Sequence, residues 1–370
     1  MRFNGSWRKI ARRVHLYLGL SIGGVLALIA LTGSILVYYP ELDENISSLS
    51  TETARPINWD TAYQTLKTHY PDKQGSWRLE STKDKHYIPA RYYNQNETVD
   101  HAFAPLMVWL SPDGRLILRE DVWGNYFVTW IYNVHFSLLA GSTGTIVIGY
   151  IGIGSLILLI SGLCAWWPKK GQWAKSLKFK ARSSVLGLLY DWHKLLGLIF
   201  ALPLILLTAT GIMLAIPKQT DPLITSLLGN IDKPNSAIIK PQRSISLSAA
   251  LSTAQEAMPN TRLAWVETPS NHNAVYRFRF KTKSDPSYRF PHSYVQVNAS
   301  TGELISVFNI DKMSIASKFK NWLHPLHNGS IGDQPLRILW VLSGVATALL
   351  FALGLFRWLI KTKRFKYTIS

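Results

Sequence analysis

The chain of 370 residues contains a single cysteine, Cys164. One cysteine excludes a disulfide framework, a Cys-x-x-Cys-His haem attachment and an iron–sulfur ligand set. The sequence also lacks a Gly-x-Gly-x-x-Gly fingerprint and a P-loop in its basic segments, so it predicts no NAD, flavin or nucleotide site there. Any redox cofactor must be held without cysteine, and its electron donor must come from elsewhere.

Acidic residues are absent from three strongly basic segments, 1–15, 168–182 and 357–370, which hold 16 of the 40 Lys and Arg residues. The remainder of the chain has 24 basic and 22 acidic residues, so these three segments account for nearly all of the net charge of +18. Basic residues gathered next to apolar stretches indicate membrane topology and contact with anionic lipid rather than nucleic-acid binding.

Four apolar stretches, residues 16–39, 145–167, 195–216 and 338–360, are each 22 to 24 residues long. About 20 helical residues cross a bilayer core of roughly 30 Å, so each stretch is long enough to span. By the positive-inside rule, both termini and the central basic loop are expected in the cytoplasm of a bacterial-type inner membrane. The first stretch exceeds a typical signal-peptide core and has no small-residue cleavage site after it, so we expect it to be retained.

This reading divides the chain into eight parts of an integral, mainly α-helical protein. They are a cytoplasmic N-terminus with the first span (1–40), a periplasmic α+β domain (41–130), the second span with its periplasmic approach (131–167), a cytoplasmic basic loop (168–190), the third span (191–216), a second periplasmic α+β domain (217–325), the fourth span with its approach (326–360) and a cytoplasmic tail (361–370).

The two soluble segments begin with the same pattern, because Ile57, Ala62 and Pro71 have the spacing of Ile245, Ala250 and Pro259. Helices are predicted over 59–70 and 246–257. Late strand-turn-strand units are predicted around Gly114 and Gly302, where turn residues separate β-branched and aromatic runs.

The apolar stretches repeat in stricter register. The first stretch, with its approach, contains His15, Gly19, Thr32 and Gly33, at successive intervals of 4, 13 and 1 residues. The third repeats these intervals with His193, Gly197, Thr210 and Gly211. In the second and fourth, the pattern His135, Gly152, Gly162, Leu163 and Trp166 recurs as His327, Gly344, Gly354, Leu355 and Trp358. The chain therefore consists of two parallel copies of helix, soluble domain, helix.

Histidines at membrane depth are functional candidates by default. The repeat predicts that His15 faces His193 near the cytoplasmic side and that His135 faces His327 near the periplasmic side. Opposed imidazoles suit a planar cofactor ligated on both faces, which indicates two b-type haems, whereas a copper or zinc site and a purely structural role are the alternatives. His324 is a second candidate for the place of His327, but its repeat equivalent is Tyr132, so the repeat favours His327.

Further residues are predicted around these sites. Gly19 and Gly197, one turn from their histidines, are expected to leave room for a porphyrin. Anionic propionates on the cytoplasmic side need cationic partners, for which Arg12, Arg13 and Lys194 are candidates unless these cations only set topology.

At these residues the chain resembles the PepSY-associated transmembrane family, whose members include inner-membrane ferric-siderophore reductases and related iron-uptake proteins. The resemblance covers nearly the whole chain, and it rests on Arg12-Arg13-Val-His15, Asp191-Trp-His193-Lys194, Pro325-Leu-His327-Asn-Gly329, Ser111-Pro-Asp-Gly114 and Asn298-Ala-Ser-Thr-Gly302. It implies PepSY-like soluble domains, two haems with bis-histidine ligation, and electron transfer from a cytoplasmic donor to a ferric siderophore in the periplasm.

The path from His135 to Trp167 exceeds the bilayer core as one unbroken helix, so breaks are expected at 141–144 and, equivalently, at 328–332. Trp130, Trp322 and His324 lie close to the periplasmic-side ligands and are the predicted lining of an acceptor recess, with interfacial anchoring as the alternative for such aromatics. Other functions that the sequence leaves open are electron transfer to quinone or a periplasmic oxidoreductase, and a non-enzymatic membrane anchor whose soluble domains bind or inhibit a periplasmic protein.

Overall fold

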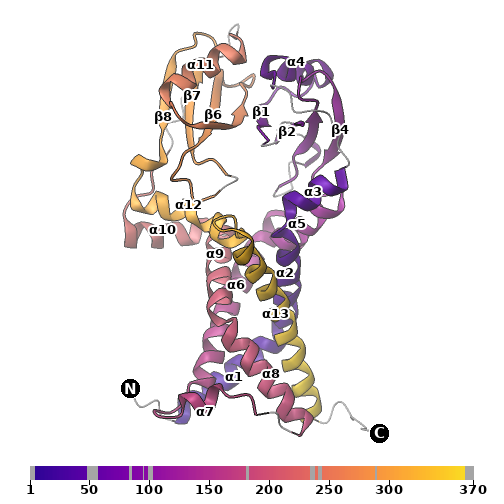
Figure 1. The fold of residues 1–370 in the computed structure, drawn as a ribbon, viewed down its shortest axis with the longest axis vertical. Coiled ribbons are helices and arrows are strands. Elements are labelled where there is room, and N and C mark those ends of the chain that lie inside the picture. The colour runs from indigo at the N-terminus through magenta and orange to yellow at the C-terminus, as the bar shows by residue number, and fades with distance from the viewer. Residues whose placement is uncertain are drawn as a thin grey trace. The chain divides into compact units, whose positions relative to one another are not determined.

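The computed structural model describes residues 5–47, 57–82, 86–94, 96–98, 103–180, 183–233, 238–240, 244–287 and 290–362. The chain forms two compact units, one of residues 1–39, 131–221 and 326–370 and the other of residues 40–130 and 222–325. The first unit is a bundle of apolar helices, and the second is built on a β-sheet (Figure 1).

Two long helices form the framework of the bundle. Helices α6 (Gly141–Trp166) and α13 (Gln334–Lys361) are each apolar and long enough to cross a membrane. Both were expected from the second and fourth apolar stretches. The first and third stretches are instead broken, into α1 (Gly5–Ser21) with α2 (Gly23–Leu36) and α8 (Val185–Ile199) with α9 (Ala201–Ala215). The described residues thus contain two candidate spans, or up to four if each bent pair is one span.

The apolar stretches 16–39 and 195–216 each contain a bend that their length and composition did not predict. The first pair is bent by 65° and the second by 61°. The breaks fall at Ile22 and Phe200, which are equivalent positions of the repeat. Pro203 lacks the N–H that would bond to the carbonyl of Ile199, which opens the helix there. At the first break, Gly23 and Gly24 let the ring of Phe351 approach so closely that a Cβ on Gly23 would lie 2.8 Å from Phe351 Cδ2.

The bends let each broken helix pack against both long helices (Figure 1). Helix α1 packs against α6 while α2 packs against α13, and in the second copy α8 packs against α13 while α9 packs against α6. Glycine permits the closest of these contacts: a Cβ on Gly344 of α13 would lie 2.4 Å from the carbonyl oxygen of Ala30 in α2. The two copies of the repeat are thereby interlocked within the bundle.

Irregular backbone precedes each long helix, but in the first copy it lies at residues 138–140, whereas the predicted break at 141–144 forms the first turn of α6. Helix α5 (Phe127–Ser137) ends before a turn in which Leu138 and Leu139 have φ of 49° and 60°, and α12 (Ile315–Asn328) ends at Gly329, whose φ is 78°. The turn residues 138–140 and 329–333 separate α5 from α6 and α12 from α13, so His135 and His327 belong to shorter helices that precede the long ones.

The second unit contains one antiparallel sheet of eight strands in the order β4-β3-β2-β1-β5-β6-β7-β8. The strands are β1 (Trp77–Glu80), β2 (Ile88–Tyr92), β3 (Leu106–Leu110), β4 (Ile117–Val122), β5 (Arg262–Glu267), β6 (Val275–Lys281), β7 (Ser293–Asn298) and β8 (Leu304–Phe308). Shorter helical segments complete the chain: α3 (Tyr39–Ser47), α7 (Trp173–Leu177), α10 (Pro217–Leu228), η1 (Asn96–Thr98) and η2 (Ile310–Lys312).

Helices α4 (Trp59–His69) and α11 (Leu247–Ala257) supply the hydrophobic core on one face of this sheet. Both were predicted within a residue of their observed ends. Asn58 and Ser246 cap them, each accepting a hydrogen bond from the backbone N–H three residues on. The predicted turns before β4 and β8 are also present, with Gly114 and Gly302 at φ of 76° and 80°.

The two soluble segments, predicted as one α+β domain for each repeat, share this single sheet. Strand β1 pairs with β5 in antiparallel register, so that Leu79 lies opposite Val266. Each repeat contributes four strands and one covering helix, and the pairing removes the open edge that β1 and β5 would each leave in a separate domain.

Candidate haem-binding histidine pairs

The bundle brings the four histidines together in two pairs. His15 of α1 and His193 of α8 have ring centroids 6.0 Å apart, and His135 of α5 and His327 of α12 have ring centroids 6.1 Å apart. Each pair joins equivalent residues of the two repeats, as the sequence pattern predicts. His327, rather than His324, is the partner that faces His135.

A backbone carbonyl of the same repeat fixes the orientation of every ring. The Nδ1 atoms lie near carbonyl oxygens at 3.0 Å (His15 to Leu158), 2.9 Å (His193 to Leu350), 2.8 Å (His135 to Ile29) and 3.1 Å (His327 to Leu207). A carbonyl oxygen can only accept, so Nδ1 carries the proton and Nε2 keeps its lone pair. This is the tautomer of a metal-ligating histidine whose other nitrogen is held by an outer hydrogen bond.

Two threonines assist the second pair. Thr32 Oγ1 lies 3.4 Å from His135 Nδ1, and Thr210 Oγ1 lies 3.1 Å from His327 Nδ1. Each hydroxyl donates to carbonyls of its own helix, so its lone pairs face the imidazole N–H. The second pair therefore has hydroxyl oxygens as additional neighbours of its Nδ1 atoms.

A glycine on a facing helix lies beside each of the four rings. A Cβ added to Gly162 would lie 2.8 Å from His15 Cε1, and one added to Gly33 would lie 2.8 Å from His135 Cε1. A Cβ added to Gly211 would lie 3.0 Å from His327 Cε1, and one added to Gly354 would lie 3.4 Å from His193 Cε1. These four glycines belong to the repeat pattern, which was the signal that could have identified them.

Gly19 and Gly197, which are predicted to leave room for a porphyrin, lie near leucine side chains. A Cβ on Gly19 would meet Leu158 Cδ1 at 3.8 Å, and one on Gly197 would meet Leu350 Cδ2 at 3.6 Å, both ordinary contacts. The structure thus gives these two positions no contact with a histidine ring.

The donor set fits a cofactor ligated on two opposite faces. A metal ion held by two imidazole nitrogens at about 2 Å each places the ring centroids roughly 6 Å apart, close to the spacing of both pairs. Within the described part of the chain, no group of three or more His, Cys, Asp or Glu side chains could hold a metal ion. The residues present therefore match the axial ligands of b-type haem better than a tetrahedral copper or zinc site.

The predicted propionate partners differ from one another in their surroundings. Arg12 and Arg13 of α1 are exposed. Lys194 is buried at its side chain, lies 3.5 Å from Asp191 and donates a hydrogen bond to the carbonyl oxygen of Lys178. Lys194 is thus engaged with α8 and the basic loop, whereas the two arginines project from the surface of the bundle.

The predicted acceptor-site residues belong to the sheet unit. Trp130 of α5 and Trp322 of α12 are 46% and 44% exposed, and the ring of His324 packs edge-on against Phe290 at 4.7 Å. His324 precedes His327 by three residues in α12 but is directed to a different neighbour.

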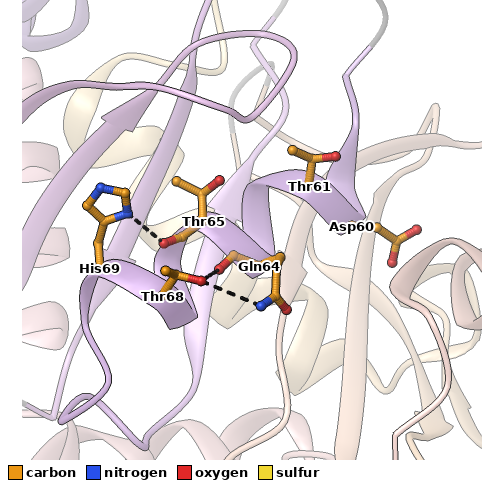
Figure 2. A pocket seen from close by; sticks show the side chains of 6 residues that line it. All are labelled: Asp60, Thr61, Gln64, Thr65, Thr68 and His69. Carbon is orange, nitrogen blue, oxygen red and sulfur yellow. Dashed lines mark hydrogen bonds between the residues drawn. The ribbon is translucent and has the colours of Figure 1, made fainter.

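A cavity of about 440 Å³ lies on the outer side of α4 (Figure 2). Its lining comes from one helix, Asp60, Thr61, Gln64, Thr65, Thr68 and His69, and includes none of the predicted site residues. Asp60 already accepts a hydrogen bond from the backbone N–H of Leu247, so this carboxylate caps α11.

A sequence comparison identifies the family of this chain. Residues 12–361 match the PepSY-associated TM region. The chain belongs to the PepSY-associated transmembrane family. The match includes all four paired histidines and every strand of the sheet, so the family assignment covers both units. No curated protein matches the chain in sequence.

Proposed function

We propose that this membrane protein binds two b-type haems, one at His15 and His193 and one at His135 and His327, and carries electrons across a bacterial inner membrane to reduce ferric siderophores in the periplasm. The observation that carries the proposal is the repeated geometry. Two pairs of rings lie about 6 Å apart, and all four Nδ1 atoms are engaged by backbone carbonyls.

The chain's own residues prepare these sites before any cofactor arrives. The carbonyls hold each imidazole in the tautomer whose Nε2 keeps its lone pair for a metal. Gly162, Gly33, Gly211 and Gly354 let a neighbouring helix approach the rings. When bound, haem iron supplies one-electron chemistry, with a potential set by its axial ligands and by burial.

The topology in this proposal has four spans, two of them bent, with both termini and the basic loop in the cytoplasm. It is supported by basic residues at the end of α6, where Lys169 and Lys170 follow Trp166, and at the end of α13, where Lys361 is the last residue. The sheet unit then faces the periplasm. Reduction there would release the iron, because oxygen chelators matched to Fe(III) hold Fe(II) poorly.

Haem content and stoichiometry test the proposal. A fully loaded preparation should contain two low-spin haems per chain by pyridine haemochrome analysis. His15→Ala or His193→Ala should remove one haem, and His135→Ala or His327→Ala the other. At most one haem per chain would contradict the two-site arrangement, and absence of a Soret band would support the non-enzymatic anchor.

Reoxidation tests the acceptor. The dithionite-reduced protein, freed of excess reductant, should be reoxidised by ferric siderophores, with Fe(II) appearing in a colorimetric chelator. Replacement of Trp130, Trp322 or His324 should slow this reoxidation while both haem spectra remain. Reoxidation by quinone or a periplasmic oxidoreductase, but not by ferric siderophore, would assign the conduit to another acceptor.

A further inference from the structure

Arg357 of α13 is the single charged residue within the four apolar stretches of the sequence. A cation at membrane depth costs free energy, so its presence there needs a specific reason. The equivalent residue in the first copy of the repeat is Ala165 of α6. The fold of the repeat therefore does not require a cation at this position, and the reason must be sought in what surrounds Arg357.

Arg357 lies one helical turn from the first histidine pair. It follows Gly354, the glycine beside the His193 ring, by three residues on the same face of α13. Its guanidinium carbon lies 5.3 Å from the centroid of the Tyr190 ring, and Tyr190 precedes His193 by three residues in α8. Both helices thus place the cation one turn beyond His193 on the side of the basic loop, close enough to act on that ring electrostatically.

One hydrogen-bond donor of Arg357 is buried without an acceptor. Among the described residues, its Nε atom is shielded from water and has no hydrogen-bond partner. The contact with Tyr190 engages the charge of the guanidinium group but provides no acceptor oxygen for Nε. A buried donor that has lost its hydrogen bonds to water and gained none destabilises the protein, and an acceptor on a bound ligand would offset that cost.

A second buried donor lies near the other histidine of this pair. Trp166 follows Gly162, the glycine beside the His15 ring, by four residues and so lies on the same face of α6. In the part of the chain that the structure describes, its indole Nε1–H is buried and has no acceptor. Its ring meets that of Trp173 edge-on at 5.6 Å, a contact that replaces a hydrogen bond only weakly. Each histidine of the first pair thus has an unsatisfied donor one turn away, on the helix that faces it.

We propose that Arg357 and Trp166 bind the propionate carboxylates of the haem held by His15 and His193. This inference rests on the proposed function for the identity of the cofactor. A b-type haem carries two propionates on one edge, and each carboxylate needs a cation or a hydrogen-bond donor when it leaves water. Arg357 supplies a cation with several N–H donors, and Trp166 supplies a neutral N–H donor.

These two donors suit the carboxylates better than the cations that the sequence suggested. Arg12 and Arg13 are exposed, so a contact with either is weakened by water and salt. Lys194 is already engaged by Asp191 and by the carbonyl oxygen of Lys178. A buried donor without an acceptor gains more from a carboxylate than an exposed one, because it gives up no hydrogen bond to water.

Esterified haem tests the inference by changing the ligand as well as the two residues. The full-length chain with His327→Ala, which keeps only the first pair, is prepared without haem and titrated in detergent with haemin or with haemin dimethyl ester, whose propionates are blocked. Soret absorbance measures both affinities. Haemin should bind at least about tenfold more tightly than the ester. Arg357→Gln should lower the affinity for haemin about tenfold and Trp166→Phe about fivefold, while neither changes the affinity for the ester.

Lys361→Gln and Trp167→Phe are the matched controls. Lys361 is an exposed cation one turn further along α13, and Trp167 is 47% exposed beside Trp166. Both variants should keep the preference for haemin over the ester. Equal affinities for the two ligands, or an equal loss of both in Arg357→Gln, would overturn the inference alone. Unchanged haemin binding in Arg357→Gln would also overturn it and assign the cation to lipid phosphate. A protein that binds neither ligand would refute the proposed function and this inference with it.

Discussion

The contact between Gly162 and His15 makes the first histidine pair sensitive to one methyl group. A Cβ at Gly162 would lie 2.8 Å from His15 Cε1, whereas carbon atoms in contact prefer about 3.5 to 4.0 Å. The ring of His15 must then retreat by roughly 0.7 Å. The carbonyl oxygen of Leu158 lies 3.0 Å from His15 Nδ1, and Leu158 is one turn before Gly162 in α6. Movement of the ring away from Gly162 therefore lengthens this hydrogen bond beyond the usual donor–acceptor distance.

Gly354 provides a matched control in the second copy of the repeat. A Cβ there would lie 3.4 Å from His193 Cε1, which is close to an ordinary contact. Both substitutions remove a glycine from the interior of a long helix, so both gain the same helix propensity of about 1 kcal/mol. The difference between Gly162→Ala and Gly354→Ala therefore isolates the displacement of the ring.

We expect Gly162→Ala to weaken haem retention at the first pair by about 1 to 3 kcal/mol, or roughly 5- to 150-fold, and Gly354→Ala to leave it nearly unchanged. Haem per chain and the rate of haem transfer to an added haem-binding protein measure the effect. Equal retention in the two variants, or a larger loss in Gly354→Ala, would refute the reasoning from ring contact.

Three further predictions concern other contacts. Gly33→Ala places a Cβ 2.8 Å from a ring carbon of the second pair, so it should deplete the second haem and spare the first, as seen in spectra of the single-haem variants. Asp60→Ala removes the acceptor for the N–H of Leu247 and should lower the melting temperature by about 2 to 4 °C, corresponding to about 1 kcal/mol. The hydrogen bond from Ser314 N–H lowers the pKa of Asp232, so its stabilising effect is present above the unfolded pKa of about 4 and lost as pH falls below it. Asp232→Asn should lack that part of the pH dependence of the melting temperature.

Patterns of neighbouring residues were sufficient to predict the helices and turns that depend on nearby sequence. The spacing of Ile57, Ala62 and Pro71, repeated in Ile245, Ala250 and Pro259, accompanied the prediction of α4 and α11, and the glycine-containing turns predicted the hairpins before β4 and β8. Apolar length predicted α6 and α13. The bend at Ile22 was missed because Gly23 and Gly24 are tolerated in straight membrane helices, and only the packing of Phe351 shows that they open this one.

The sequence by itself determined the repeat, and through it the equivalence of His15 with His193 and of His135 with His327. A strict register is visible without coordinates, and two-fold symmetry then requires equivalent residues to face each other.

Only the tertiary structure decided which groups surround each ring and which strands meet. The carbonyl partner of His15 is 143 residues away, and the Arg78–Trp265 contact joins different repeats. Such contacts depend on how bent helices cross and on the pairing of β1 with β5. Periodicity along the chain gives the face on which a side chain lies but not the segment that packs against it, so the glycine neighbours of each ring and the pairing of β1 with β5 were visible only in the fold.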